Sequence, residues 1–147
     1  MHDLPQRFEA DSVGRALALV GERWTLLILR EAFFGVRRFG ELSRNLGIPK
    51  PTLSARLRTL VDAGLLDRVP HGDHHEYRLT DRGRDLFPAV VALMRWGDEH
   101  LGGPSIALRH HACGEVVRAR VVCGHCTGEI TTDSVTPEAV VGSTGGD

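Results

Sequence analysis

The chain has 147 residues, of which 41% are hydrophobic, and its 18 basic and 19 acidic side chains give a net charge of −1. This length suits one compact domain with a small appendage, and the apolar fraction supplies a core without a disulfide framework. Because the chain starts with no charged-then-apolar leader and has no apolar run of bilayer length, we expect a cytoplasmic protein without a membrane partner.

The charge is distributed unevenly along the chain. Between Arg23 and Arg58, eight basic residues accompany only two acidic ones, Glu31 and Glu41, so this stretch carries a charge of +6. A local positive patch matters more for binding phosphates than the net charge does. A solvated helical face without a partner has the same composition, so charge alone leaves both interpretations open.

Hydrophobic residues recur at helical spacing in three stretches of the first half of the chain. The spacing predicts an amphipathic helix over 12–33. Gly21 weakens the middle of this helix and marks a candidate break there. A second, shorter helix is expected to end at Gly47, and a third to end at Gly64. A short helix joined to the next by a tight, glycine-containing turn is typical of a helix-turn-helix.

The following stretch changes to the period of β-strands. Strands are predicted over 65–69 and 76–79, and the polar segment 70–75 between them is interpreted as a long, mobile hairpin tip. A long helix is expected to start at Thr80 or Asp81 and to end before the Gly-Gly-Pro at 102–104.

These elements predict an α+β fold that is mainly α, a winged helix-turn-helix with long first and last helices. Four parts are expected: an N-terminal arm over 1–10, the winged-helix domain over 11–103, a small Cys/His appendage over 104–130 and a disordered acidic tail over 131–147.

A winged helix-turn-helix places its third helix in the major groove of duplex DNA, where side chains reach base edges. If the leucines of the third helix face the core, its solvent side is expected to contact bases through Lys50, Thr52, Arg56 and Thr59. Phosphate contacts are expected from Ser54 and Arg58 on the flanks, from Arg37 and Arg38, and from Arg68, Arg78 and the histidine-rich tip of the hairpin. The hairpin directly after the third helix favours DNA binding over a merely solvated arginine-rich face.

Several motifs in this order resemble the HxlR-type winged-helix regulators. The matching stretches, within about residues 11–101, are WTLLILRE at 24–31, RRFGEL at 37–42, LSARL at 53–57 and EYRLTDRG at 76–83. The resemblance implies a bacterial-type transcriptional regulator, a repressor or an autoregulator, that binds DNA as a homodimer whose first and last long helices pack across a two-fold axis. Such a dimer predicts a pseudo-palindromic operator with half-sites about one helical turn, or a multiple of it, apart.

Large apolar residues of the predicted first and last long helices indicate a dimer interface independently of the family resemblance. Trp24, Phe87, Met94 and Trp96 provide more aromatic and sulfur-containing surface than a core of this size must hold.

One departure from the family concerns sensing. Some members detect oxidants through a cysteine just before the first long helix, but this chain has Asp-Ser-Val at 11–13, so no thiol sensing is expected there. Whether a small-molecule effector binds elsewhere stays open.

All three cysteines lie in the appendage, in two close pairs of ligand-type residues. Cys-x2-Cys spacing lets a tight turn present two thiolates to one tetrahedral ion. The pairs predict a structural zinc site whose ligands are His110, Cys113, Cys123 and Cys126, with His111 and His125 as substitutes for the fourth ligand. Exposed reactive thiols, a Cys123–Cys126 or interchain disulfide, and a ribbon that has lost its metal remain alternatives.

Three other function classes compete with DNA binding. No catalytic triad order and no glycine-rich phosphate loop is visible, so we expect no enzyme. A winged helix that binds only proteins is a second hypothesis, but such a surface has no need of the +6 stretch. A thiol-based sensor that uses the C-terminal cysteines is a third.

Overall fold

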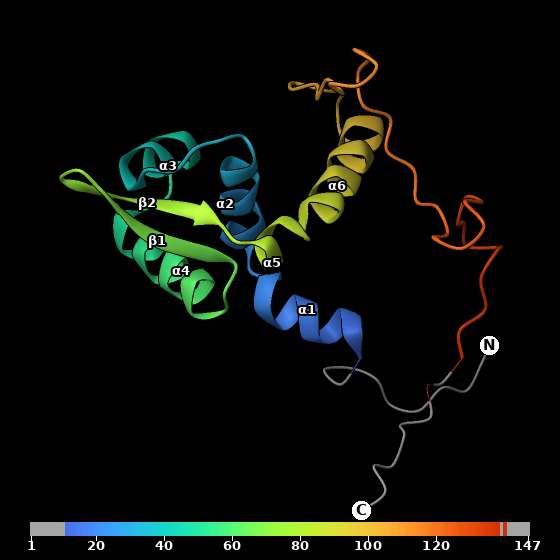
Figure 1. Ribbon diagram of the computed structural model, residues 1–147, viewed down its shortest axis with the longest axis horizontal. Helices are drawn as coiled ribbons and strands as arrows, with labels where there is room; N and C mark the ends of the chain where they lie inside the picture. The colour runs from blue at the N-terminus through green and yellow to red at the C-terminus, as the bar shows by residue number, and fades with distance from the viewer. Residues whose placement is uncertain (1–10, 139, 141–147) are drawn as a thin grey trace, which may run out of the picture.

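The computed structural model describes residues 11–138 and 140, and it forms a winged helix-turn-helix body from which α1 and α6 project on one side (Figure 1). The elements in chain order are α1 (Ser12–Val20), α2 (Arg23–Phe33), α3 (Phe39–Leu46), α4 (Lys50–Asp62), β1 (Leu66–His71), β2 (His74–Leu79), α5 (Asp81–Arg84) and α6 (Phe87–His100). The predicted arm over 1–10 and the end of the predicted tail, at 139 and 141–147, lie outside the described residues. Among the described helices, none has the length and apolar character needed to cross a bilayer.

The helix predicted over 12–33 is divided into two helices. Gly21 closes α1 by donating its N–H to the carbonyl oxygen of Leu17 at 2.7 Å, and the Glu22 side chain starts α2 by accepting the N–H of Trp24 at 2.9 Å. A Cβ at Gly21 would lie 2.4 Å from the Leu17 carbonyl oxygen, so only glycine fits this junction. The break expected at Gly21 is therefore confirmed.

The helix-turn-helix consists of α3 and α4 at the predicted positions. Gly47 ends α3 in the left-handed conformation, with φ at 64°, and Pro49 precedes α4. The hydroxyl of Ser43 donates to the carbonyl oxygen of Ile48 at 3.2 Å and thereby braces the turn. The buried Glu31 of α2 accepts a hydrogen bond from the Asn45 amide of α3 at 3.3 Å, which fixes α3 against α2.

One continuous core joins the helices to the base of the hairpin. Three leucines of α4 at helical spacing, Leu53, Leu57 and Leu60, are completely buried. They pack in one cluster with Val20, Ile28, Leu29, Leu42, Ile48, Leu65 and Leu66. Burial of each such side chain contributes about 1.5–3 kcal/mol, so this cluster sets the rotation of α4 about its axis.

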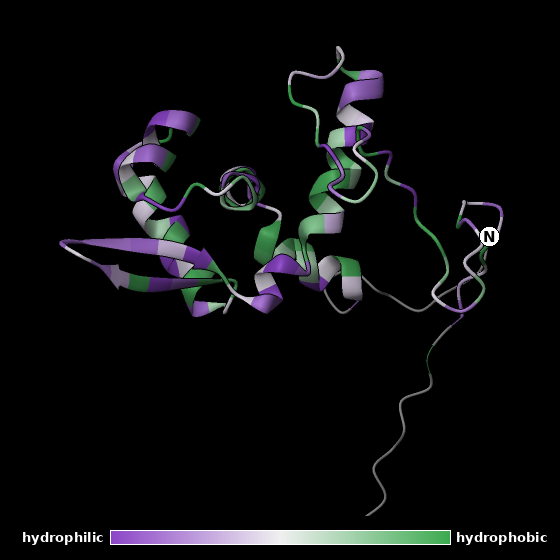
Figure 2. Ribbon diagram, turned by 45° about the horizontal axis from the view of Figure 1, so that its top comes forward, coloured by the Kyte–Doolittle hydropathy of each residue, from purple (hydrophilic) through white to green (hydrophobic). Residues whose placement is uncertain are grey.

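The hairpin, or wing, has a shorter tip than the sequence predicted. β1 and β2 pair antiparallel up to His71 opposite His74, which leaves only Gly72 and Asp73 in the turn. Gly72 has φ at 59°, and glycine at the first central position is typical of the type II′ turn that joins strands in a two-residue hairpin. The prediction of a long tip over 70–75 was wrong, since these residues continue the two strands almost to the turn. In a two-stranded sheet both strands are edge strands, and an edge strand tolerates Pro70 and the histidines. Hydrophilic residues cover most of the wing (Figure 2).

The long last helix predicted from Thr80 is also two helices. The Thr80 hydroxyl caps the short α5 by accepting the N–H of Gly83 at 3.0 Å, and α6 begins separately at Phe87. The rings of Phe87 and Phe33 meet edge to face with their centroids 5.1 Å apart, so the start of α6 is attached to the end of α2. Most of α6 beyond this contact is exposed.

A first prediction concerns Gly83, which packs against the start of the wing. A Cβ there would lie 2.2 Å from the carbonyl oxygen of Leu65, whose backbone is held in the core. Gly83→Ala should therefore lower the free energy of unfolding by about 1–3 kcal/mol, measured by urea denaturation. Gly40→Ala is the matched control, because nothing lies within 4 Å of a Cβ at Gly40 in α3. Equal stability of the two variants would contradict this packing.

Candidate nucleic-acid interface

A concave surface lies between α3, α4 and the wing, and we call it the basic hollow. Its lining comprises Arg38, Phe39, Gly40, Glu41, Arg44, Ser54, Arg58, Val61, Arg68, His74, His75 and Tyr77. Arg38 comes from the start of α3, Arg58 from α4 and Arg68 from β1. Three consecutive elements thus place cations on one face.

The arginines of the basic hollow are not neutralised within the protein. In the part of the chain that the structure describes, no carboxylate lies within 4.0 Å of the guanidinium nitrogens of Arg38, Arg44, Arg58 or Arg68. Arg68 does approach the His75 ring across the wing, with 3.3 Å between Nη2 and Nδ1. Unpaired guanidinium groups on a concave surface suit the binding of phosphate oxygens, to which arginine donates two parallel hydrogen bonds.

Two of the predicted site residues lie at the start of α4, and a third lies near its end. Lys50 is exposed and Thr52 is half-buried, next to the free N–H groups of the first turn. The positive end of the helix adds to the charge of Lys50 and favours an anion there. Thr59 is exposed, but its hydroxyl donates to the Ala55 carbonyl oxygen of its own helix at 3.1 Å.

The structure places Arg56 on the flank of α4 that faces α2. Its side chain is 36% exposed and lies beside the buried leucine stripe, with Nε 3.6 Å from a carboxylate oxygen of Glu22 at the start of α2. Arg56 therefore pairs with α2, away from the wing, although its Nε makes no hydrogen bond among the described residues. Ser54 and Arg58, which the sequence placed toward the flanks, line the basic hollow instead. Whether any of these residues contacts DNA remains a prediction.

Sequence reasoning did not select Arg44 as a site residue. It lies in α3 on the side opposite the buried Leu42, and it lines the basic hollow. The signal for it in the sequence is its place on the polar face of the predicted second helix, within the +6 stretch.

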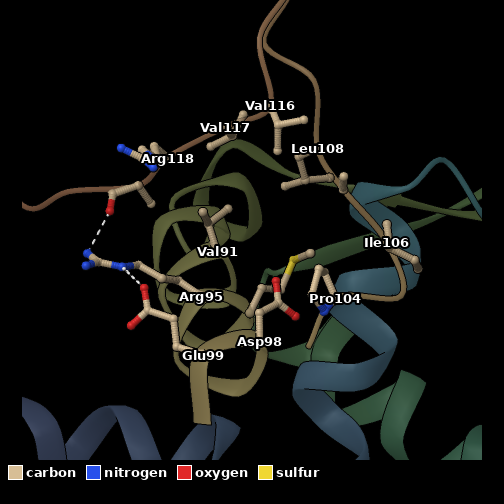
Figure 3. A pocket seen from close by; sticks show the side chains of 13 residues that line it. Val91, Arg95, Asp98, Glu99, Pro104, Ile106, Leu108, Val116, Val117 and Arg118 are labelled. Carbon is tan, nitrogen blue, oxygen red and sulfur yellow. Dashed lines mark hydrogen bonds and ion pairs between the residues drawn. The ribbon is translucent and has the colours of Figure 1, made fainter. Parts of the chain in front are cut away.

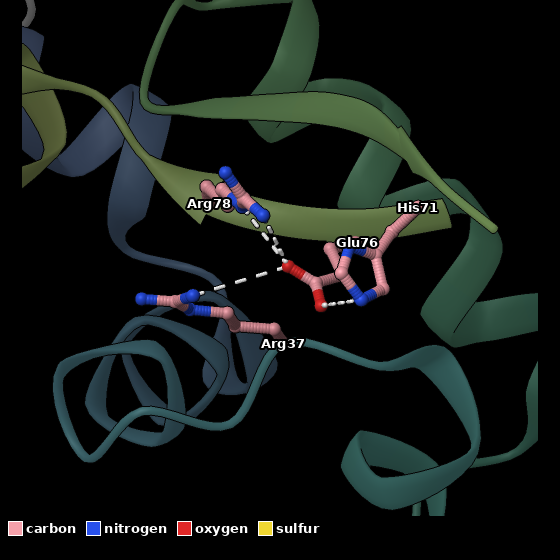
Figure 4. Close-up of polar contacts among 4 residues, drawn as sticks. All are labelled: Arg37, His71, Glu76 and Arg78. Carbon is pink, nitrogen blue, oxygen red and sulfur yellow. Dashed lines mark hydrogen bonds and ion pairs between the residues drawn. The ribbon is translucent and has the colours of Figure 1, made fainter. Parts of the chain in front are cut away.

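Arg37 and Arg78 share one carboxylate at the edge of the wing (Figure 4). Glu76, which is 8% exposed, accepts hydrogen bonds from Arg78 at 2.9 Å, while Nη1 of Arg37 lies 3.9 Å away and Nε2 of His71 3.6 Å away. The hydrogen bond from Arg78, helped by the charges of His71, Arg78 and Arg37, lowers the pKa of Glu76 below its ordinary value. Two guanidinium groups thus surround one carboxylate, which leaves positive charge at the surface.

The wing is also held by the backbone beside this cluster. The N–H of Tyr77 donates to the carbonyl oxygen of Arg37 at 2.8 Å, so β2 is bonded to the linker between α2 and α3. This bond keeps Arg37 and Arg38 next to the wing, where the predicted phosphate contacts need them.

The appendage begins by packing along α6. A cavity of about 220 Å³ lies between α6 and residues 104–119 (Figure 3). Arg95 on its rim donates hydrogen bonds to Glu99 at 3.1 Å and to the Ala119 carbonyl oxygen at 2.9 Å, which ties the appendage to the helix.

The four predicted zinc ligands are found as two separate pairs. Nδ1 of His110 lies 3.5 Å from Sγ of Cys113, and the Cys123–Cys126 pair lies farther along the chain. Across the described residues, no group of three or more His, Cys, Asp or Glu side chains is gathered, and all three cysteines are free thiols. Backbone N–H groups of Cys126 and His125 lower the pKa of the Cys123 thiol.

A second prediction follows from the lowered pKa of Glu76. The folded protein binds the Glu76 carboxylate in its charged form, so the ion pairs stabilise the fold above the ordinary carboxyl pKa of 4.5 and are lost as the pH falls through the lower folded value. Wild-type protein should therefore lose more stability than Glu76→Gln when the pH is lowered from neutral through this range. Urea midpoints for both proteins across this pH range measure the difference, and parallel curves would contradict it.

Comparisons with known proteins agree with this geometry. The model of the HxlR-like helix-turn-helix family matches residues 19–104. An uncharacterized HTH-type transcriptional regulator of Mycobacterium tuberculosis (strain H37Rv), Rv3095, is 68% identical over 142 residues, which cover 92% of this chain and 90% of that protein.

Solved structures show the same likeness. The crystal structure of PA1607, assigned as a transcription factor, is 38% identical with a TM-score of 0.79, over 90% of this chain and 99% of that one. The redox regulator HypR in its reduced form is 30% identical with a TM-score of 0.57, over 61% of this chain and 93% of that one. The chain belongs to the HxlR-like helix-turn-helix family of transcriptional regulators.

Proposed function

We propose that the protein binds duplex DNA as a homodimer and regulates transcription as a repressor or an autoregulator. The observation that carries this proposal is the basic hollow, where four arginines without a carboxylate partner lie on the face that also holds the exposed side of α4. The negative net charge of the whole chain does not oppose it, because the residues that line the hollow include four arginines and one acidic residue, Glu41.

In this proposal α4 enters the major groove and the wing lies along the neighbouring backbone. Lys50 and Thr52 at the start of α4, together with Ser54, reach base edges, while Arg58 and Arg68 hold phosphates on the two sides of the hollow. Arg38 and Arg44 of α3 bind the phosphates on which the helix-turn-helix rests. The paired Arg56 positions α4 and contributes little direct contact.

The homodimer is supported by apolar side chains on the two projecting helices. Val13 and Leu17 of α1 are 66% and 55% exposed, and Leu93 and Trp96 of α6 are 56% and 57% exposed. Large exposed apolar residues grouped on helices are typical of a protein interface. Of the other residues expected there, Phe87 is exposed, whereas Trp24 packs against the core and Met94 is half-buried beside the cavity.

A third prediction tests the basic hollow with matched arginine variants. Arg58→Ala and Arg68→Ala should each weaken duplex binding and reduce the slope of log K against log salt by about 1, because each removes one phosphate contact. Fluorescence anisotropy on one duplex across a salt series measures both effects. Arg84→Ala is the control, since Arg84 is paired with Asp81 on α5. Equal affinities and slopes for all three variants would contradict the interface.

The same assay separates the two flanks of α4. Arg56→Ala removes an ion pair with Glu22 and no unpaired cation, so it should change the salt slope less than Arg58→Ala does. A larger change of slope for Arg56→Ala would show that α4 docks with the opposite flank toward DNA.

A fourth prediction tests the dimer. Leu93→Asp places a charge in the proposed interface and should shift the protein from dimer to monomer in sedimentation equilibrium. Val135→Asp introduces the same carboxylate at an apolar residue that is 57% exposed but lies outside α1 and α6, so this variant should remain a dimer. A monomeric wild-type protein, or a dimer that withstands Leu93→Asp, would contradict this interface.

A further inference from the structure

The appendage contains the same backbone hairpin twice. Each copy starts at a residue that can bind metal, and two backbone hydrogen bonds form there. The N–H of this residue donates to the carbonyl oxygen of the residue five positions later. Its own carbonyl oxygen accepts the N–H of the residue four positions later. In the first copy these bonds are His110 to Glu115 at 2.9 Å and Gly114 to His110 at 2.8 Å. In the second they are Cys123 to Gly128 at 2.8 Å and Thr127 to Cys123 at 2.8 Å. We call the copies the first knuckle, 108–117, and the second knuckle, 121–130.

The flanking residues repeat as well. One isolated bridge closes each knuckle, Arg109 with Val116 in the first and Val122 with Glu129 in the second. Outside each bridge a further backbone hydrogen bond pairs the ends, from Val117 to Leu108 at 2.7 Å and from Ile130 to Val121 at 2.9 Å. The two segments therefore agree over their whole length, although their sequences differ at most positions.

Both knuckles need a left-handed residue at the same place. Gly114 has φ at 75°, and Thr127 at the equivalent position has φ at 60°. Among the non-glycine residues that the structure describes, only Thr127 has a positive φ. This conformation is especially unfavourable for a β-branched side chain. A backbone outlier of this kind persists where a function requires the turn.

The repeat places four metal-ligating side chains at equivalent positions. His110 and Cys113 are the first and fourth residues of one turn, and Cys123 and Cys126 are the first and fourth residues of the other. In the first knuckle the two ligand atoms already lie 3.5 Å apart. In the second, the N–H of His125 points at Sγ of Cys123, with 3.4 Å between them. Each knuckle therefore presents half of a tetrahedral ligand set.

We propose that the two knuckles of one chain close around a single zinc ion, held by His110, Cys113, Cys123 and Cys126. Four protein ligands complete the tetrahedral coordination of zinc and leave no position for a substrate, so the site is structural. Three thiolates and one imidazole suit zinc better than magnesium or calcium, which prefer oxygen ligands.

Closure requires a bend between the knuckles. The first knuckle lies against α6, with which Leu108, Val116 and Val117 line one cavity, whereas the second stands away from the helices (Figures 1 and 2). Residues 118–120 between them have no regular structure. The nine residues from 114 to 122 can span up to about 30 Å when extended, so the chain is long enough for the two pairs to meet.

Apolar side chains of the second knuckle favour the same closure. Val121 and Val122 are 61% and 47% exposed there, whereas Val116 and Val117 of the first knuckle line the cavity against α6. Folding the knuckles together would remove part of this surface from water. Zinc binding to such a ligand set releases much more free energy than the ordering of a few linker residues costs.

The test is the zinc content of the full-length chain, purified under reducing conditions and dialysed without metal. We expect one zinc per chain, and the tetrahedral absorption bands of a sulfur-rich site after replacement by Co²⁺. Cys126→Ser and His110→Ala should each lose the stoichiometric metal and the bands. His111→Ala is the matched control and should keep both, because His111 lies between the ligand positions of the first knuckle.

Three results would overturn the proposal. One is the absence of bound metal in the wild-type protein. Another is half a zinc per chain that His110→Ala leaves unchanged, which would mean that cysteine pairs of two chains share the ion. The last is loss of zinc in His111→Ala with retention in His110→Ala. Duplex binding by the same variants reports on the helix-turn-helix separately, so failure of the zinc site is distinguishable from failure of DNA binding.

Discussion

The rotation of α4 about its axis is the constraint on which the rest of the structure depends. Leu53, Leu57 and Leu60 have no exposed surface, and turning α4 in either direction would remove at least one of them from the core. Each such loss would cost about 1.5–3 kcal/mol, a large fraction of the stability of a small domain. With this rotation fixed, Arg58 must face the wing and Arg56 must face α2. The core therefore decides which cations are available to a partner.

The arginines divide into two groups by their partners. Arg30, Arg56 and Arg78 each lie beside a carboxylate that also braces the fold, through Glu31, Glu22 and Glu76 respectively. Arg38, Arg44, Arg58 and Arg68 have no such partner among the described residues, and they lie around one hollow. Charge counted along the sequence cannot separate these groups, since the acidic partners Glu22 and Glu76 lie outside the stretch that was counted. The separation appears only when distant elements are brought together.

The sequence predicted most of the winged-helix body because its signals are local: apolar periodicity for α3 and α4, Gly47 and Gly64 at their ends, and the change of period at the wing. It failed where the outcome depends on contacts between elements. Arg56 is within reach of Glu22 only after α2 and α4 pack, and the histidines of the wing form strands because β1 and β2 pair. The repeat in the appendage was invisible for another reason. The two knuckles share backbone hydrogen bonds while Gly114 in one corresponds to Thr127 in the other.

Methylation interference on a duplex selected from a random pool tests the central claim most directly, because N7 of guanine is exposed in the major groove. The account predicts that N7 methylation blocks binding at two clusters of guanines, related by a pseudo-two-fold axis and separated by about one helical turn or a multiple of it. Selection of a duplex on which N7 methylation has no effect anywhere would contradict the placement of α4 in the major groove.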